Sequence, residues 1–313
     1  MSKILGIDTS NYTTSCALLD TDTMEVIQSK KLLPVKAGEK GIRQSDAVFH
    51  HTKQLPEMMS AVYDGSGLGG IGVSVKPRLV EGSYMPCFLV GESAADMLGT
   101  VCGIEPDKTS HQVGHILAAL YSCCMLSLAA KAEEFIAFHI SGGTTDMLLC
   151  KGGGENVVEI TEIGHSLDLK AGQAVDRAGV MLGLSFPCGK ELEALAANSD
   201  KQFKVRPVIK GMDCSLSGIE NKCKAMLSEG SPREDIAKYC ITAICEAVRA
   251  MTAAALEQYG DLPVIYAGGV MSNRFIADRL SKEFGGHFAA PEFSCDNAVG
   301  CAIYSAFRKG LIG

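Results

Sequence analysis

The chain has 313 residues, of which 47% are hydrophobic and 21% are charged, and its formal net charge at pH 7 is −7. This composition is that of a globular protein with a substantial core, and the length fits two domains. The acidic balance excludes binding of nucleic acid through overall charge, so a polynucleotide partner would need a local basic face or another subunit.

The thirteen cysteines are scattered through apolar segments, and no Cys-x-x-Cys spacing occurs. A zinc ribbon or a thioredoxin-type site is therefore not expected. The odd number of cysteines and the lack of a signal peptide favour reduced thiols in the cytoplasm. No apolar run approaches the roughly 20 residues that a membrane span needs, so no membrane partner is expected.

Two segments far apart in the chain share one pattern. Residues 4–20 read as an apolar strand, a polar tip and a second apolar strand, and residues 135–149 repeat this order. Such a repeat indicates two lobes of similar plan. The polar residues at the two tips are Ser10, Asn11, Ser141, Gly142, Gly143, Thr144 and Thr145.

The two tips are candidates for binding a phosphate chain. Glycine lets backbone N–H groups approach a ligand closely, and Ser and Thr hydroxyls add further donors. An ordinary tight turn explains either tip alone. The pair favours the phosphate interpretation.

Residues 111–120 predict a helix that Thr109 or Ser110 caps at its start. His111 and His115 are four residues apart, so they lie on one helix face, which suits two ligands of one divalent metal. The alternative is a capped helix whose histidines bond only to the backbone. A third ligand elsewhere in the chain would decide between the two interpretations.

Asp296 is the best-placed carboxylate to be that third ligand. It lies where a loop becomes a helix rich in small residues. A carboxylate at this place is most often only a favourable charge at a helix N-terminus. With the two histidines, however, it would complete a His, His, Asp site with open positions for a substrate.

Further candidate ligand contacts follow the second hairpin. Asp176, on a predicted helix over residues 166–184, could bond a sugar hydroxyl, although a solvated acid is the simpler interpretation. Gly189 lies in a loop that suits a flat ligand. The strand over residues 264–267 breaks into Gly268 and Gly269, and Asn273 then opens a helix. A strand, a glycine pair and a helix N-terminus are frequent at nucleotide contacts in α/β proteins.

The ordered series of motifs resembles the TsaD (Gcp, glycoprotease-like) family, the transferases that make threonylcarbamoyladenosine in tRNA. The matching segments are ILGIDTS at 4–10, HQVGH at 111–115, SGGTT at 141–145, LDLKAGQAVDRAGVMLGL at 167–184, DCSLSG at 213–218, AGGVMSN at 267–273 and CDNAVG at 295–300. Relatives usually carry an acidic pair just after the first TS, where this chain has Tyr12 and Thr13.

The resemblance implies an α/β fold of the two-lobed, duplicated type shared by sugar kinases, actin and chaperone ATPases. We expect an N-terminal lobe over residues 1–108 and a C-terminal lobe over residues 109–296 that carries the metal and nucleotide site. The C-terminal helix, residues 297–313, is expected to pack back on the N-terminal lobe.

The resemblance also implies an activity. In the family, a threonylcarbamoyl group passes from threonylcarbamoyl-AMP to the N6 amine of the adenosine next to the anticodon in tRNA. By position, one divalent metal (Fe or Zn) would be held by His111, His115 and Asp296. Nucleotide contacts would fall on residues 141–145, Asp176, Gly189 and Asn273. TsaB-like and TsaE-like proteins, and ATP or an adenylate, are the implied partners.

Two other hypotheses stay open at this point. The first is transfer of a carbamoyl or acyl group from an adenylate to another acceptor. The second is a nucleotide-binding partner subunit without catalysis. A metallopeptidase is least favoured, because the His-x-x-x-His spacing lacks the adjacent Glu that serves as general base in HExxH.

Overall fold

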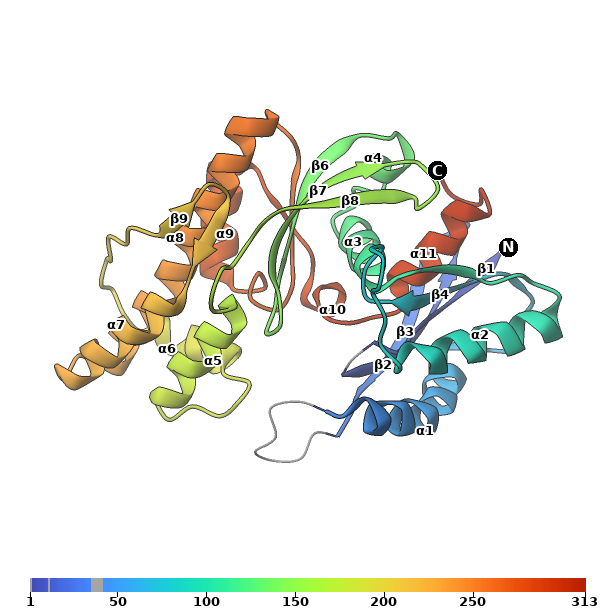
Figure 1. Cartoon of the computed structure of the whole chain (residues 1–313), viewed down its shortest axis with the longest axis horizontal. Coiled ribbons are helices and arrows are strands. Elements are labelled where there is room, and N and C mark those ends of the chain that lie inside the picture. Colours follow the sequence, from blue (N-terminus) through green and yellow to red (C-terminus); the bar gives the residue numbers. More distant parts are fainter. Residues whose placement is uncertain (1, 11, 35–41) are drawn as a thin grey trace. The chain divides into compact units, whose positions relative to one another are not determined.

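The computed structural model describes residues 2–10, 12–34 and 42–313 (Figure 1). The chain divides into two compact units. Unit 1 comprises Met1–Glu133, Lys151–Glu159 and Asp296–Gly313, and unit 2 comprises Glu134–Cys150 and Ile160–Cys295.

Unit 1 is built on a five-stranded sheet in the order β3-β2-β1-β4-β5. Its strands are β1 (Lys3–Asp8), β2 (Thr13–Asp20), β3 (Val26–Leu32), β4 (Leu68–Lys76) and β5 (Asp107–Ser110). β1 pairs with β2, and β2 with β3, in antiparallel register, whereas β1, β4 and β5 run parallel. Residues 4–8 of β1 are all buried, as expected for a central strand with both faces covered.

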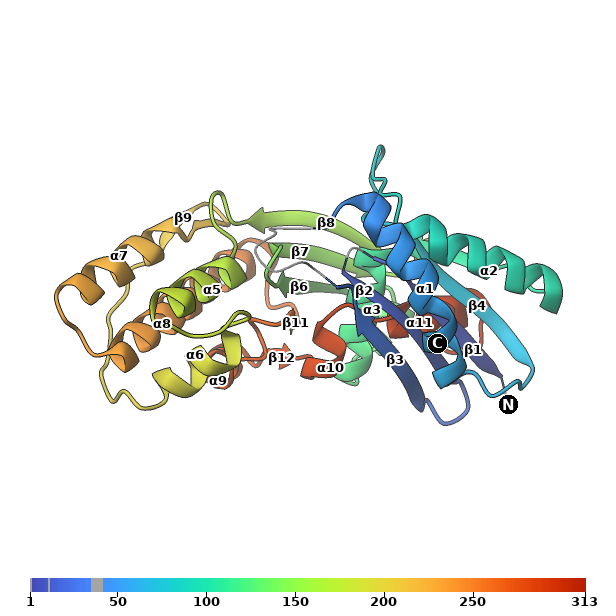
Figure 2. The same cartoon turned by 90° about the horizontal axis from the view of Figure 1, so that it is seen from below.

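Helices cover both faces of this sheet (Figures 1 and 2). α1 and α2 lie on one face, where α1 packs against β2 and β3 and α2 packs against β4. α11 and α3 lie on the other face, and α11 contacts β1, β4 and α3. The helices of unit 1 are α1 (Gln44–Val62), α2 (Phe88–Cys102), α3 (His111–Ser122), α4 (Ser127–Ala130) and α11 (Val299–Arg308).

Unit 2 carries a second five-stranded sheet that repeats the plan of the first. Its strands are β6 (Glu134–Ile140), β7 (Thr145–Gly152), β8 (Val158–His165), β11 (Val264–Ala267) and β12 (His287–Phe288). In the sheet these strands lie side by side in the order β8-β7-β6-β11-β12. The first, second, third, fourth and fifth strands of this sheet along the chain therefore take the same places as β1, β2, β3, β4 and β5 in the sheet of unit 1. The expected duplicated α/β fold is therefore confirmed.

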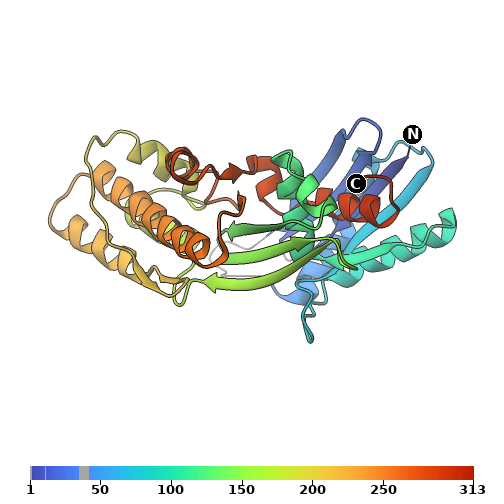
Figure 3. The same ribbon diagram turned by 90° about the horizontal axis from the view of Figure 1, so that it is seen from above.

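A long helix, α8 (Arg233–Tyr259), forms the centre of the helical part of unit 2 and is orange in Figure 3. Around it pack α5, α6, α7 and α9 and the small hairpin of β9 and β10. Their bounds are α5 (Ala171–Met181), α6 (Gly189–Ala196), α7 (Ser217–Ser228), α9 (Arg274–Phe284), β9 (Val208–Lys210) and β10 (Asp213–Ser215), and the short α10 covers Pro291–Ser294.

α8 is also the one helix among the described residues that is long and apolar enough to cross a membrane. No apolar run of this length was expected from the sequence. Burial accounts for the composition, because 67% of the most apolar window of α8 is covered inside the unit 2 core.

The compact units differ from the lobes expected from the sequence at three places. Lys151–Glu159 and Asp296, both expected in the C-terminal lobe, belong to unit 1. Residues 109–133 were assigned to the C-terminal lobe, but the structure assigns them to unit 1. The reason is packing: α3 follows β5 directly and lies against α11, β4 and β5. The candidate metal helix is therefore part of unit 1.

Candidate metal centre

The two histidines and the distant aspartate meet in unit 1. The hydroxyl of Ser110 accepts the N–H of Val113 and so caps the start of α3. His111 and His115 then project from the first turns of this helix, with their Nε2 atoms 2.9 Å apart. Oδ1 of Asp296 lies 3.2 Å from Nε2 of His115 and 3.5 Å from Nε2 of His111.

This geometry fits a bound cation. Two ring nitrogens and a carboxylate oxygen, which are metal-ligand atoms in their deprotonated forms, lie within 4.8 Å of one another. In a tetrahedral site with bonds of roughly 2.0–2.1 Å, neighbouring ligand atoms lie roughly 3.3 Å apart. The observed separations of 2.9–3.5 Å bracket that value.

The pKa values at the site also favour a bound positive charge. Burial opposes protonation of His111, but the carboxylates of Asp8 and Asp296 outweigh it and raise the pKa of His111 to about 10. Burial and the charge of His111 lower the pKa of His115. Burial alone would raise the pKa of Asp296, yet the two histidines hold it well below its usual value. The centre therefore favours one positive charge among its three side chains.

Asp8, the last residue of β1, orients His111. Its Oδ2 accepts the Nδ1–H of His111 at 2.8 Å, and its side chain is 1% exposed. The hydroxyl of Ser74 donates to Oδ1 at 2.6 Å. A carboxylate that accepts from the second nitrogen of a ligating histidine fixes the tautomer and turns the lone pair of Nε2 toward the metal.

Asp8 was not predicted from the sequence. Its place follows from the pairing of distant strands, because β1, β4 and β5 run parallel and their carboxyl ends meet at one edge of a sheet. Asp8 ends β1 and His111 follows β5, so both lie at that edge.

Ser10, a predicted nucleotide contact, supports Asp8 in this structure. Its N–H donates to Oδ1 of Asp8 at 3.0 Å and its hydroxyl donates to Oδ2 at 3.2 Å. Asn11, the other predicted contact of this tip, lies outside the described residues. The hydroxyl of Thr13, the first residue of β2, donates to Oδ2 of Asp296 at 3.3 Å, so this strand touches a candidate ligand.

Close backbone packing brings Asp296 to the histidines. A Cβ at Gly300, in the first turn of α11, would lie 1.8 Å from the carbonyl oxygen of Gly114 in α3. A Cβ at Gly72 of β4 would lie 1.9 Å from the carbonyl oxygen of Cys301. Only glycine allows such a close approach of two backbones. The approach holds α11, and Asp296 just ahead of it, beside α3.

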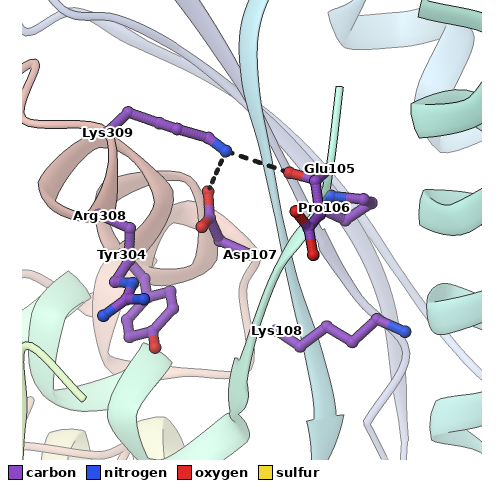
Figure 4. A pocket seen from close by; sticks show the side chains of 7 residues that line it. All are labelled: Glu105, Pro106, Asp107, Lys108, Tyr304, Arg308 and Lys309. Atoms are coloured by element: carbon purple, nitrogen blue, oxygen red, sulfur yellow. Dashed lines mark hydrogen bonds and ion pairs between the residues drawn. The ribbon is translucent and has the colours of Figure 1, made fainter. Parts of the chain in front are cut away.

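Unit 1 has a hollow of about 240 Å³ at the opposite ends of β5 and α11 from the candidate ligands (Figure 4). Its lysine and arginine side chains already have partners. Lys309 lies 3.4 Å from a carboxylate oxygen of Asp107, Lys108 pairs with acids of α2, and Arg308 donates to the backbone carbonyl of Glu155. Each of these three cations therefore already has a hydrogen-bond or ion-pair partner within unit 1.

The glycine-rich tip of the second hairpin lies in unit 2, between β6 and β7. The hydroxyls of Ser141 and Thr144 are 2.8 Å apart, and the N–H groups of Gly143 and Thr144 donate to Ser141 Oγ. A Cβ at Gly172 would lie 2.6 Å from Cα of Gly142. The tip therefore rests directly on the first turn of α5, and the hydroxyl of Thr145 accepts the N–H of Ala171 there.

Asp176 and the residue before Gly189 are joined by a hydrogen bond. Oδ1 of Asp176 accepts the N–H of Cys188 at 2.8 Å, and Gly189 begins α6. Burial raises the pKa of Asp176. Asp176 also lines a hollow of about 430 Å³, together with Arg177, Val180, Met181, Phe186, Glu220 and Lys224.

The second glycine pair lies beside the end of β6. Gly268 has a φ of +101°, and a Cβ there would lie 2.2 Å from the carbonyl oxygen of Ile140. The next residue but one, Val270, donates its N–H to that same oxygen. Gly269 is exposed, and Asn273 caps α9 by accepting the N–H of Ile276. The tip at Ser141 and the turn at Gly268 thus share the carboxyl ends of β6 and β11.

Comparisons with known proteins place the chain among characterised ones. Residues 24–303 match the family model described as "TsaD: tRNA N6-adenosine threonylcarbamoyltransferase". The chain is 30% identical to the tRNA N6-adenosine threonylcarbamoyltransferase of Aromatoleum aromaticum, covering 98% of this chain and 91% of that protein.

Solved structures show the fold. The (R)-2-hydroxyglutaryl-CoA dehydratase component A of Acidaminococcus fermentans has a TM-score of 0.57 and 16% identity, covering 99% of this chain and all of that one. A ROK family glucokinase of Streptomyces griseus has a TM-score of 0.52 and 12% identity, covering 98% of this chain and all of that one. Both likenesses agree with the duplicated sheet plan.

Proposed function

The chain belongs to the TsaD family of tRNA N6-adenosine threonylcarbamoyltransferases and is a transferase, and on this premise we propose its full reaction. It transfers a threonylcarbamoyl group from threonylcarbamoyl-AMP to the N6 amine of the adenosine next to the anticodon in tRNA. The observation that carries this proposal is the convergence of His111, His115 and Asp296, with Asp8 behind them.

The side chains of unit 1 hold one divalent metal, Fe or Zn. His111 and His115 give it nitrogen ligands, Asp296 gives a charged oxygen, and Asp8 keeps the proton of His111 on Nδ1. A divalent metal held by these side chains would supply Lewis-acid chemistry for an acyl oxygen. The hydroxyl of Thr13 fixes the second oxygen of Asp296.

The residues of unit 2 bind the nucleotide part of the donor. The exposed backbone at Gly142 offers an N–H group to the phosphate, next to the positive end of the α5 dipole. Asp176 bonds a ribose hydroxyl, and residues 268–273 close the same end of the sheet. The glucokinase with this fold is in complex with AMPPNP, an adenine nucleotide analogue.

The transfer itself is a substitution at the carbamoyl carbon. The N6 amine of the adenosine forms the new N–C bond, the bond from carbon to phosphate oxygen breaks, and AMP leaves with the negative charge. N–H donors at the tip of the second hairpin stabilise the charge that grows on the leaving phosphate. The amine gives up one proton in the process.

The proposal extends to partners and place of action. TsaB-like and TsaE-like proteins assist the chain, ATP or the adenylate is its small-molecule ligand, and the reaction takes place in the cytoplasm. The cysteines support the last point, because none of the thirteen, all of which the structure describes, forms a disulfide.

One departure favours a second candidate function. Tyr12 and Thr13 stand where the resemblance to the family leads us to expect an acidic pair, so any step that needs a carboxylate at these two positions is lost. This would suit transfer from an adenylate to a different acceptor, by the same metal and nucleotide sites.

Complementation separates the candidates. The chain is expressed in a strain depleted of its own TsaD, and threonylcarbamoyladenosine is measured in digested tRNA by mass spectrometry. We expect the modified nucleoside to return with the native chain and not with His111→Ala. If the native chain binds metal and adenylate yet restores no modified nucleoside, the tRNA activity is refuted and the other acceptor is favoured.

A further inference from the structure

The most cationic stretch of the chain has no part in the sites described above. Residues 201–210 contain Lys201, Lys204, Arg206 and Lys210 and no acidic residue, in a chain whose net charge is −7. The stretch lies in unit 2 and ends with β9. In an acidic chain, a polynucleotide partner needs a local basic face of this kind.

The side chains of this stretch alternate between core and solvent. Phe203, Val205 and Ile209 are partly buried and pack against the core of unit 2. Lys204, Arg206 and Lys210 are exposed. Because every second residue is anchored in the core, the cations between them are held on one outer surface.

The exposed cations are not neutralised by the chain itself. Lys201 pairs with Asp235 at 3.3 Å, whereas Lys204, Arg206 and Lys210 form no ion pair with any residue of the described ranges. Asp213 stands opposite Lys210 in the β9–β10 register, but its carboxylate accepts the N–H of His165. We call Lys204, Arg206 and Lys210 the basic strip.

We infer that the basic strip binds the phosphate backbone of RNA. Cations two residues apart along an extended chain are separated by roughly 6.6 Å, and the strip spans at most roughly 20 Å. That length suits successive phosphates of one strand better than a single small anion. The inference rests on the proposed function, because it takes the tRNA substrate as the ligand.

The test compares two triple variants of the full chain. The strip variant is Lys204→Gln, Arg206→Gln, Lys210→Gln. The control variant is Lys131→Gln, Lys222→Gln, Lys282→Gln, which removes the same charge from exposed lysines elsewhere. Binding of a fluorescent tRNA transcript and of a single-stranded RNA is followed by anisotropy over a range of salt concentrations.

We expect the strip variant to bind both RNAs about 10- to 100-fold more weakly than the control variant. The slope of log K against log[salt] should fall in magnitude by about two to three, since each lost phosphate contact removes roughly 0.7–0.9. Equal affinity and equal slope in the two variants would overturn the inference, as would a native chain that binds neither RNA. Strip-dependent binding of polyglutamate in place of RNA would also overturn it.

Failure of the strip and failure of the proposed function give different results. Metal content and thermal unfolding of both variants should match those of the native chain, because the candidate metal ligands lie in unit 1. Strip-dependent RNA binding without complementation refutes the proposed function and leaves the strip standing. Complementation by the native chain with strip-independent RNA binding refutes the strip alone.

Discussion

Asp8→Asn is the sharpest perturbation of the candidate metal centre. The amide keeps an oxygen for the hydroxyl of Ser74, which donates to Asp8 at 2.6 Å, so the change fits the buried site. Its NH₂ group would then face Nδ1 of His111, where Asp8 now accepts at 2.8 Å. Nδ1 must become the acceptor, the proton moves to Nε2, and the lone pair that should bind the metal is lost.

The expected loss of metal affinity follows from this change of tautomer. Removal of a partner behind a ligating histidine typically costs 10- to 100-fold in metal affinity. A factor of 10 to 100 corresponds to about 1.4–2.7 kcal/mol of binding free energy. The buried negative charge that Asp8 brings next to the site is lost as well, so the upper part of this range is expected.

The assay is a competition titration of Zn²⁺ against a chelator of known affinity, with Asp46→Asn as the matched control. Asp46 is exposed in the first turn of α1, and its change also removes one carboxylate. Native and control chains should bind equally, and Asp8→Asn should bind at least tenfold more weakly with an unchanged unfolding curve. Native affinity in Asp8→Asn would refute the role given to the His111 tautomer.

Three further predictions follow from individual contacts. Gly300→Ala should lower the free energy of unfolding by about 1–3 kcal/mol and lower the metal content, because the new Cβ would collide with the carbonyl oxygen of Gly114. Denaturant unfolding and metal analysis measure these two quantities, and unchanged values of both would contradict the prediction. Thr13→Val should weaken Zn²⁺ binding by about 2- to 10-fold through loss of its hydrogen bond to Asp296, and Thr13→Ser should restore it in the same titration. Burial lowers the pKa of His51 to about 4, below its unfolded value of 6.5. As the pH falls, the unfolded chain therefore takes up a proton at His51 before the folded chain does. About 2–3 kcal/mol of the free energy of unfolding, present above pH 6.5, is lost as the pH falls toward 4. His51→Gln should lack this part of the loss in unfolding experiments at pH 7 and pH 4.5, and an equal loss in both chains would contradict it.

Local patterns predicted those parts of the fold that depend on neighbouring residues. The strand of residues 4–8 and the cap at Ser110 could be read directly, because a short apolar run and a capping hydroxyl are properties of a few consecutive residues. The repeated hairpin predicted the duplicated sheet, since both halves place their first two strands in the same order. The spacing of His111 and His115 likewise follows from helix geometry alone.

Tertiary packing decided what local patterns could not. Residues 109–133 were expected in the second lobe because they follow the first in the chain, but the contact of α3 with α11 holds them in unit 1. Asp8 was not predicted because the residues around it do not indicate that it will meet His111, about a hundred residues further along the chain. The bond from the side chain of Ser10 to Asp8 is likewise a contact that only the folded structure shows, and the nucleotide contact expected of Ser10 stays a prediction.

Metal content measures the central claim most directly. The native chain, His115→Ala and the control Asp46→Asn are purified in parallel from metal-supplemented medium, and bound metals are quantified by mass spectrometry. The account predicts about one Fe or Zn per native and control chain and almost none in His115→Ala. A native chain without a bound divalent metal, or an equal content in His115→Ala, would contradict it.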